Sequence, residues 1–292
     1  MKESIEYKVF QFFNYVFLAL LTFVTLYPMW HVLIGSISDG QALMTNRGLL
    51  FFPIGQANLD AYRSVSTNPN ILIGYQNTLF ILIVGVPLQV ILTSLGAYVL
   101  SRKTFGLRNP FMFFVSFTMF FAGGMIPLYL VVRDLGLINN LMSVVFPFAV
   151  SAYNLIIMRT SFLAIPVSLE ESARMDGASH FTIYSRIVMP LSKAVIAVMV
   201  LYYGVGIWNG WFWASVFIRS REVFPLQLIL REILILNDLS TMTQGSANDD
   251  AAFLSEGIRY ATIIVSTLPI LTVYPFLQKY FAKGVMIGAI KG

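Results

Sequence analysis

The chain has 292 residues, of which 57% are hydrophobic, 15% aromatic and only 11% charged. Soluble domains carry about 25% charged residues, so this composition excludes a soluble domain and indicates an integral membrane protein. The absence of cysteine excludes disulfides and thiolate metal sites, and the net charge of +5 comes without the basic run that nucleic-acid binding would need.

Apolar stretches of the sequence are long enough to cross a membrane. A helix needs about 20 mostly apolar residues to span the hydrocarbon core of a bilayer. Six stretches meet that requirement, and none of them contains Asp, Glu, Lys or Arg. The first is too long for the core of a signal peptide, so we interpret it as a retained transmembrane helix. We therefore predict an all-α integral membrane protein, a single domain over 1–292, with six transmembrane helices at about 9–34, 74–100, 111–132, 141–158, 194–217 and 260–277.

Basic residues indicate the orientation of these spans, because Lys and Arg accumulate in cytosolic loops. With the N-terminus inside, 12 of the 19 Lys and Arg residues fall on the cytosolic side and 7 on the outer side, although the outer segments are longer. The short loop 101–110 carries three basic residues, whereas the loop 133–140 carries one. Both termini are therefore predicted to lie in the cytosol.

Two long segments fall on the outer side. The first, 35–73, is rich in Asn, Gly, Pro and Ser, which suits a folded surface loop. The second, 218–259, contains an apolar stretch at 224–236 that is too short to span a membrane. This stretch is predicted to form a helix that is either surface-lying or re-entrant.

The cytosolic loop 159–193, between the fourth and fifth spans, contains a predicted short helix. Ser168 is a good N-cap, and Glu171 three residues later completes a capping box. Gly177 can take the left-handed conformation that ends a helix. A second helical segment follows Ser179, and Pro190 ends it before the fifth span. Such a helix is either an elbow that returns the chain to the bilayer or a docking element for a soluble partner.

The same loop resembles a family signature. It reads E-S-A-R-M-D-G over 171–177, and I-V-M-P follows at 187–190. This resembles the signature loop of the permease subunits of ATP-binding-cassette (ABC) importers, which reads E-A-A, three residues, G, nine residues and I-x-L-P. Ser172 and Met189 are small departures from that pattern. Further stretches resemble the carbohydrate-uptake (type I) branch of the family, namely G-G-M-I-P-L-Y at 123–129, W-N-G at 208–210, Y-F-A-K-G at 280–284 and A-I-K-G at 289–292.

The resemblance implies a function and a set of coupling residues. It implies a multi-pass permease of the bacterial inner membrane that forms half of the translocation path for an oligo- or polysaccharide. Within the family the chain is also similar to permease subunits of bacterial alginate importers. The loop would be the coupling helix that docks on a cytosolic ATPase. The coupling residues implied are Glu170, Glu171, Ala173, Asp176, Gly177, Ala178, Ile187 and Pro190.

The resemblance also implies partners and cofactors. The chain would form a heterodimer with a second, non-identical permease. Two ATP-binding cassette subunits and an extracytoplasmic solute-binding protein would complete the importer, and no nucleic acid is expected. ATP and Mg would bind the partner ATPase subunits, whereas this chain would hold no cofactor or metal and would not be an enzyme. Consistent with that division, the sequence lacks the phosphate-binding G-x-x-x-x-G-K-[ST] pattern.

Other classes of membrane protein fit the sequence less well. An ion-coupled secondary transporter, the main alternative, usually places ionisable residues inside the membrane. All six predicted spans lack acidic residues, although sodium sites built from carbonyl groups stay open to such a protein. A membrane-embedded enzyme would need a nucleophile, an acid–base pair or a metal cluster. The two histidines, His31 and His180, are predicted at opposite membrane faces and form no such cluster.

Polar and aromatic residues within the spans are candidates for the substrate path. A glycan needs hydrogen-bonding groups and aromatic faces, and a polar group that faces lipid is costly. Each candidate can equally be explained as a helix–helix hydrogen bond or an interfacial anchor. The candidates are Gln89, Thr93, Ser94, Tyr153, Asn154, Trp208 and Asn209.

Overall fold

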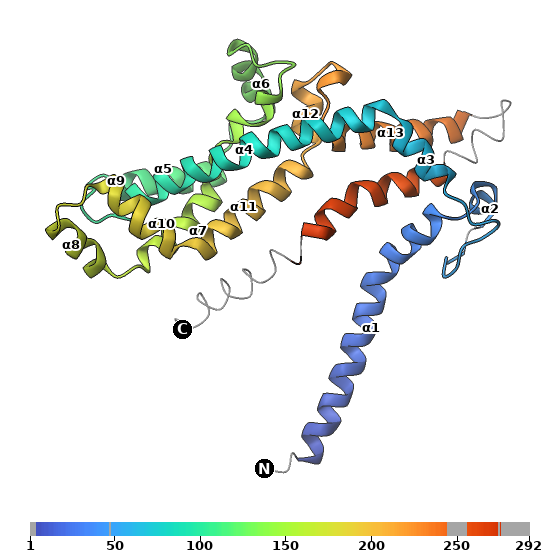
Figure 1. Ribbon diagram of the computed structural model, residues 1–292, viewed down its shortest axis with the longest axis horizontal. Helices are drawn as coiled ribbons and strands as arrows, with labels where there is room; N and C mark the ends of the chain where they lie inside the picture. Colours follow the sequence, from blue (N-terminus) through green and yellow to red (C-terminus); the bar gives the residue numbers. More distant parts are fainter. Residues whose placement is uncertain (1–3, 47, 244–255, 274, 276–292) are drawn as a thin grey trace. The chain divides into compact units, whose positions relative to one another are not determined.

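A computed structural model describes residues 4–46, 48–243, 256–273 and 275 of the chain (Figure 1). These residues form helices joined by turns and loops, and no strand occurs among them. The chain divides into two compact units. The first unit comprises Met1–Ile71 and Leu230–Leu268, and the second comprises Leu72–Ile229 and Pro269–Gly292.

The first unit begins with a long apolar helix, α1 (Ile5–Ser36), which Ser4 caps by accepting a hydrogen bond from the Tyr7 N–H. Apolar side chains are exposed along most of α1, as expected of a helix that is surrounded by lipid. Two short helices follow it, α2 (Gly40–Thr45) and α3 (Asp60–Thr67).

The segment between α1 and α3 is folded. Ile34, Leu43 and Leu50 form a small buried cluster, against which Tyr260 of the helix Glu256–Val273 packs. The Ser38 hydroxyl donates to the Ile34 carbonyl and accepts a hydrogen bond from the Ile54 N–H. The first part of the predicted outer segment 35–73 is therefore folded against the end of α1, whereas its last residues, from Pro69, begin the long helix α4.

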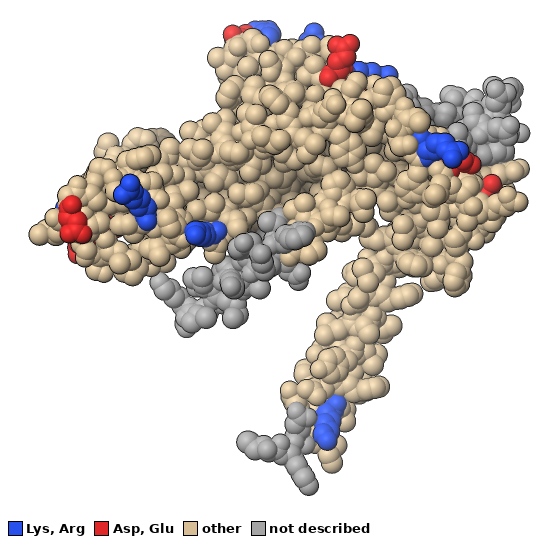
Figure 2. Space-filling view, in the orientation of Figure 1, with Lys and Arg blue, Asp and Glu red and all other residues tan. Residues whose placement is uncertain are grey.

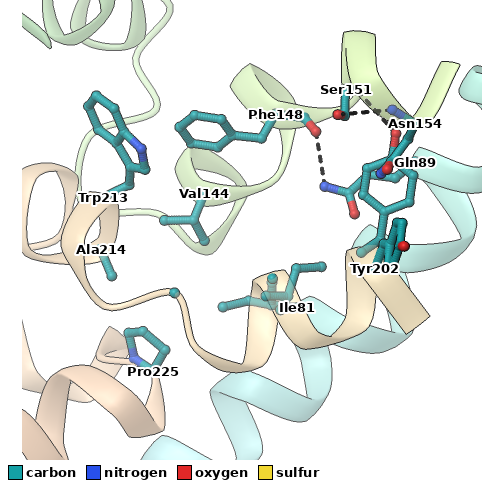
Figure 3. A pocket seen from close by; sticks show the side chains of 14 residues that line it. Ile81, Gln89, Val144, Phe148, Ser151, Asn154, Tyr202, Trp213, Ala214 and Pro225 are labelled. Atoms are coloured by element: carbon teal, nitrogen blue, oxygen red, sulfur yellow. Dashed lines mark hydrogen bonds between the residues drawn. The ribbon is translucent and has the colours of Figure 1, made fainter. Parts of the chain in front are cut away.

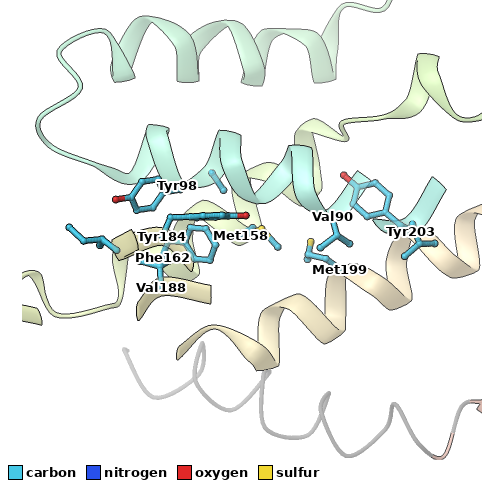
Figure 4. Packing of buried hydrophobic residues seen from close by; sticks show 11 residues of the cluster. Val90, Tyr98, Met158, Phe162, Tyr184, Val188, Met199 and Tyr203 are labelled. Atoms are coloured by element: carbon cyan, nitrogen blue, oxygen red, sulfur yellow. The ribbon is translucent and has the colours of Figure 1, made fainter. Parts of the chain in front are cut away.

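The second unit is built on three helices, α4 (Pro69–Ser101), α7 (Ala152–Leu163) and α11 (Lys193–Trp208), which lie alongside one another (Figure 1). A connected set of apolar side chains is buried between them, together with residues of the segment that precedes α11 (Figure 4). Its fully buried members are Ala97, Met158, Phe162, Ile183, Val188 and Met199.

Buried hydroxyl groups join these three helices. The Tyr203 hydroxyl of α11 lies 2.6 Å from the Thr93 hydroxyl of α4 and accepts a hydrogen bond from the Ser151 N–H, just before α7, at 3.1 Å. The Tyr184 hydroxyl forms a similar pair with Ser94 at 2.7 Å. Because each of these polar groups has a partner, α4 can bury them in an apolar core.

The predicted spans agree only partly with single helices. Three of them correspond to continuous helices, α1, α4 and Glu256–Val273, although residues 274, 276 and 277 of the predicted span 260–277 lie outside the described residues. The predicted spans 111–132 and 141–158 lie in helix pairs that bend sharply, and 194–217 shares only α11 with a third such pair. By length and composition the described residues hold between three and six candidate spans. The pairs are α5 (Arg108–Phe120) with α6 (Met125–Asp134) at 113°, Leu141–Phe148 with α7 at 49°, and His180–Leu191 with α11 at 83°.

Local sequence explains where these bends fall. Between α5 and α6 the chain passes through Gly124, whose φ of 88° suits glycine and ends a continuous helix. The bend before α7 follows two 3₁₀ turns, η1 (Leu141–Val144) and η2 (Phe146–Phe148), and Pro147 lies in the second. The predicted span 194–217 is also interrupted, because α11 ends at Trp208 and a separate helix, α12 (Phe212–Phe217), follows it.

The segment after α12 contains a 3₁₀ turn, η4 (Arg221–Val223), and then α13 (Leu226–Thr243), which includes most of the apolar stretch predicted at 224–236. The start of α13 lies close to α4, because a Cβ atom on Gly74 would be 2.9 Å from the Leu226 Cα. The Leu226 N–H also donates to the buried Thr78 hydroxyl at 2.9 Å. A glycine and a hydroxyl on α4 therefore fix where α13 begins.

Charged side chains gather at two ends of the second unit. On the face shown in Figure 2 they lie over α8 (Val167–Met175) and α9 (His180–Ile183) at one end, and over α6 and the loop after α12 near the other. The surface over the middle of α4 and α11 is uncharged on this face. This arrangement suits a unit whose middle lies in lipid and whose ends reach water.

Removal of the Tyr203 hydroxyl should destabilise the second unit. In Tyr203→Phe the Thr93 hydroxyl and the Ser151 N–H lose their partner, so we expect the free energy of unfolding to fall by about 1–3 kcal/mol. Thermal unfolding in detergent measures this effect, with Tyr153→Phe, an exposed tyrosine on α7, as the matched control. Equal midpoints for the two variants would contradict the prediction.

Candidate functional site

The cytosolic loop of the sequence folds as a short helix, α8, whose beginning differs from the prediction. The helix begins at Val167, Pro166 occupies the N-cap position, and no side chain caps it. Ser168 thus lies inside the first turn, and the predicted capping box of Ser168 and Glu171 is wrong. The helix begins directly after Pro166, a residue that is excluded from helix interiors but tolerated where a helix starts, so the start lies two residues before the position that Ser168 as N-cap would give.

The end of α8 agrees with the prediction. Gly177 has a φ of 79°, in the left-handed region, and follows the C-cap residue Asp176. The Gly177 N–H donates to the Arg174 carbonyl and the Ala178 N–H to the Ala173 carbonyl, both at 2.9 Å. These two bonds form a Schellman motif, which satisfies the last carbonyl groups of the helix. The turn that ends α8 is therefore formed by Ala173, Asp176, Gly177 and Ala178.

The chain after this turn runs back to the core. Ser179 caps α9 by accepting a hydrogen bond from the Thr182 N–H at 3.2 Å. A π-helical turn, η3 (Tyr184–Val188), and a short turn, α10 (Met189–Leu191), continue it. Ile187 packs against the buried cluster, whereas Pro190 is exposed in α10. The helical segment extends to Leu191, one residue beyond the proline that was expected to end it.

Two faces of α8 have different surroundings. Val167, Leu169, Glu171 and Met175 are exposed, and Met175 retains 89% of its accessible surface. Phe181 of α9 is exposed as well. Ser168, Ser172 and Arg174 are exposed too, so the accessible surface of α8 combines apolar side chains with polar and charged ones, a composition that suits contact with another protein.

The opposite face of α8 carries a buried charge. Glu170 is 4% exposed and forms an ion pair with Arg102, which directly follows α4 and is 9% exposed. Burial, the main effect, lowers the pKa of the Arg102 guanidinium from its ordinary value, and the charge of Arg174 acts in the same direction. Of the two neighbouring glutamates predicted for coupling, Glu170 is therefore turned into the protein and Glu171 is turned out.

A cavity of about 330 Å³ lies between α4, α7, α11 and α12 (Figure 3). Aromatic side chains line much of it, and the Phe148 and Trp213 rings lie 5.4 Å apart. Its size is at the lower end of small-molecule sites. None of its lining side chains is charged, and they are Ile81, Gln89, Val144, Phe148, Ser151, Asn154, Tyr202, Tyr203, Gly206, Ile207, Gly210, Trp213, Ala214 and Pro225.

Gln89 supplies the cavity with an unused hydrogen-bond acceptor. Its side chain is 3% exposed and donates from Nε2 to the Phe148 carbonyl at 3.0 Å (Figure 3). Its Oε1 atom has no hydrogen-bond partner among the described residues. A buried carbonyl oxygen without a partner is costly. The oxygen itself is buried, so the Gln89 side chain would have to turn before a hydroxyl or amide group of a molecule in the cavity could donate to it.

The structure brings together some of the predicted path residues. Gln89 and Asn154 both line the cavity, and the exposed Tyr153 stacks on Tyr202, which lines it, at 6.3 Å. Trp208 is buried and packs on the Tyr75 ring instead, and Asn209 is the exposed C-cap residue of α11. Neither of them lines the cavity.

Two further candidates, Thr93 and Ser94, form the hydroxyl pairs within the core. These contacts agree with the alternative given above for each candidate, a hydrogen bond between helices. Sequence reasoning missed Phe148, Ser151 and Trp213, which line the cavity. The W-N-G motif lies within five residues of Trp213 and was the available signal for it.

Comparisons with known proteins agree with the signature loop. The family of binding-protein-dependent transport system inner membrane components matches residues 4–287. Protein LplC of Bacillus subtilis (strain 168) is 42% identical over 285 residues, which cover 98% of this chain and 96% of that protein. The polygalacturonan/rhamnogalacturonan transport system permease protein YtcP of the same organism is 37% identical, with 98% and 99% covered.

A solved structure is similar over nearly the whole chain. It is the crystal structure of a bacterial ABC transporter involved in the import of the acidic polysaccharide alginate. The similar chain has a TM-score of 0.85 and 35% sequence identity, and the match covers 96% of this chain and 99% of that chain.

Proposed function

Because this chain belongs to the family of binding-protein-dependent transport system inner membrane components, we propose that it forms half of the translocation path of an ABC importer for an oligo- or polysaccharide. It is a multi-pass permease of the inner membrane and not an enzyme, since ATP hydrolysis in this family belongs to separate subunits. The observation that carries the proposal is the family signature, folded as the exposed helix α8 at one end of the second unit.

A saccharide substrate is supported by the relatives and by the cavity. YtcP is named for polygalacturonan and rhamnogalacturonan, and the similar solved structure imports alginate. Sugar rings have apolar C–H faces that stack on aromatic rings, and hydroxyl groups that need partners. The cavity offers the Phe148 and Trp213 rings for the first and Gln89 and Asn154 for the second. Because its lining is uncharged, it suits the hydroxyl groups of a sugar rather than a carboxylate.

The family indicates which kinds of partner subunit the chain needs. An ABC importer needs a partner permease, an ATPase and a binding protein. We propose that the partner permease is non-identical, that two ATP-binding cassette subunits hold ATP and Mg, and that α8 docks on one of them. Its docking surface would be the exposed side of α8 that carries Val167, Glu171 and Met175, opposite the inward side of Glu170 and Ala173.

The ion-coupled alternative finds no support. The family that matches this chain belongs to binding-protein-dependent transport systems, YtcP is named as the permease protein of a transport system, and the similar solved structure is an ABC transporter. We therefore propose an ABC importer and not an ion-coupled transporter.

Six spans with both termini in the cytosol are the topology we propose. Each bent helix pair counts as one span, which gives six. The chain lacks cysteine, so single cysteines at Lys103, Leu135 and Gly292 can be tested with a membrane-impermeant thiol reagent. In cells with a permeabilised outer barrier only Leu135→Cys should react. A reaction of Gly292→Cys before the inner membrane is opened would refute this topology.

The end of α8 provides the test of the docking function. Gly177→Val places a β-branched residue at a positive φ, which costs about 1–2 kcal/mol. Gly177→Asn is the matched control, since Asn tolerates this conformation. We expect the ATPase to co-purify with wild type and with Gly177→Asn, and to be depleted from Gly177→Val, which should still insert in the membrane. Equal recovery of the ATPase with all three would contradict a docking role for this turn.

The cavity can be tested by filling it. Gly206 lines the cavity, and Gly204 on the same helix does not. A Cβ atom at either position would meet none of the described atoms within 4 Å. Gly206→Leu should therefore fold and bind the ATPase but reduce ATP-driven uptake by about tenfold. Gly204→Leu carries the same change of helix propensity and should transport nearly as wild type does. Equal uptake by both variants would remove the cavity from the path.

A further inference from the structure

The ion pair between Arg102 and Glu170 joins the two helices that carry the proposed functions. Arg102 lies directly after α4, the helix that brings Gln89 to the cavity. Glu170 lies on the inward face of α8, the helix whose outward face is exposed. Both side chains are at least nine-tenths buried.

Several further contacts hold Arg102 in place. Its guanidinium group lies over the Tyr98 ring, 4.9 Å from the ring centre. Its Nε donates to the Ser101 hydroxyl at 3.0 Å, and its Nη2 to the Phe162 carbonyl of α7 at 3.4 Å. Arg159 of α7 donates in turn to the Leu100 carbonyl at 2.9 Å. The guanidinium group therefore contacts the ends of α4 and α7 as well as α8.

Stability alone is a weak explanation for this ion pair. Removing two charges from water costs free energy that their mutual attraction often only offsets, and an apolar pair of similar volume is frequently as stable. What this ion pair adds, together with the hydrogen bonds of the Arg102 guanidinium to Ser101 and Phe162, is a fixed position for the charged group that Glu170 faces. The apolar contacts with the core that Ala173 of α8 and Ala178 after the turn make lack that directional constraint.

We propose that Arg102 and Glu170 are positioning residues that transmit the displacement of α8 to α4. When the ATPase moves the docking helix, Glu170 would move the guanidinium group, and with it the ends of α4 and α7. Both helices line the cavity, since Gln89 lies on α4 and Asn154 on α7. The ion pair would thus couple ATP hydrolysis to a change in the cavity. This inference rests on the proposed docking of α8 on the ATPase.

The test compares variants that lose the charge pair in different ways. Glu170→Gln removes one charge, Arg102→Met with Glu170→Leu replaces the pair by apolar side chains, and Arg102→Glu with Glu170→Arg reverses it. Asp60→Asn is the control, because it removes one carboxylate from an exposed ion pair with Arg63. Each variant is assembled with its partner subunits in proteoliposomes, and substrate uptake is measured per ATP hydrolysed.

We expect Glu170→Gln and the apolar double variant to bind the ATPase and hydrolyse ATP, but to transport about fivefold less substrate per ATP. The reversed pair should recover at least half of the wild-type ratio, and Asp60→Asn should keep it. A wild-type ratio in the apolar double variant would overturn the proposal, because packing alone would then suffice, even if Glu170→Gln failed to fold. Failure of wild type to bind any ATPase would instead refute the docking function on which the inference rests.

Discussion

Polar groups inside a membrane span cannot use water, so each must find a partner within the protein. This constraint determines how α4 packs in the second unit. Gln89, Thr93 and Ser94 are all buried, and they bond to the Phe148 carbonyl, the Tyr203 hydroxyl and the Tyr184 hydroxyl. These bonds connect α4 to three other segments and fix its rotation about its own axis. The cavity and the attachment of α8 both depend on that rotation, because it sets the direction in which Gln89 and the end of α4 face.

Because α4 is continuous from Gln89 to its last residue, next to Arg102, a displacement at one of these positions can reach the other. From Gln89 to Arg102 is 13 residues, or about 20 Å of helix at 1.5 Å per residue. A helix whose polar groups are paired and whose apolar face is closely packed moves as a rigid body more readily than it bends. A displacement applied at Arg102 therefore reaches the Gln89 side chain without an intervening loop. The sharp bends fall elsewhere, before α7 and α11 and between α5 and α6.

Sequence patterns predicted part of this structure and missed the rest for identifiable reasons. Apolar length predicted where the helices lie, and Gly177 with its neighbours predicted the turn after α8. Length says nothing about direction, so the 113° bend at Phe121–Gly124 was missed although two glycines are present there. The prediction of Ser168 as an N-cap failed because the helix begins at Val167, directly after Pro166, and Ser168 lies in its first turn. The opposite orientations of Glu170 and Glu171 depend on Arg102, 68 residues earlier, and spacing within α8 could not identify that partner.

The uncharged cavity has a consequence for a charged polysaccharide. Two opposite charges attract far more strongly in an apolar interior than in water. A lysine or arginine in the cavity would therefore hold a sugar carboxylate tightly and slow its release. A translocation path must bind its substrate strongly enough to admit it and weakly enough to let it leave. Amide and hydroxyl groups such as those of Gln89, Ser151 and Asn154, together with aromatic faces, provide contacts that one sugar unit can exchange for the next. If the substrate is acidic, its charge is then recognised best where water screens the interaction, outside the cavity.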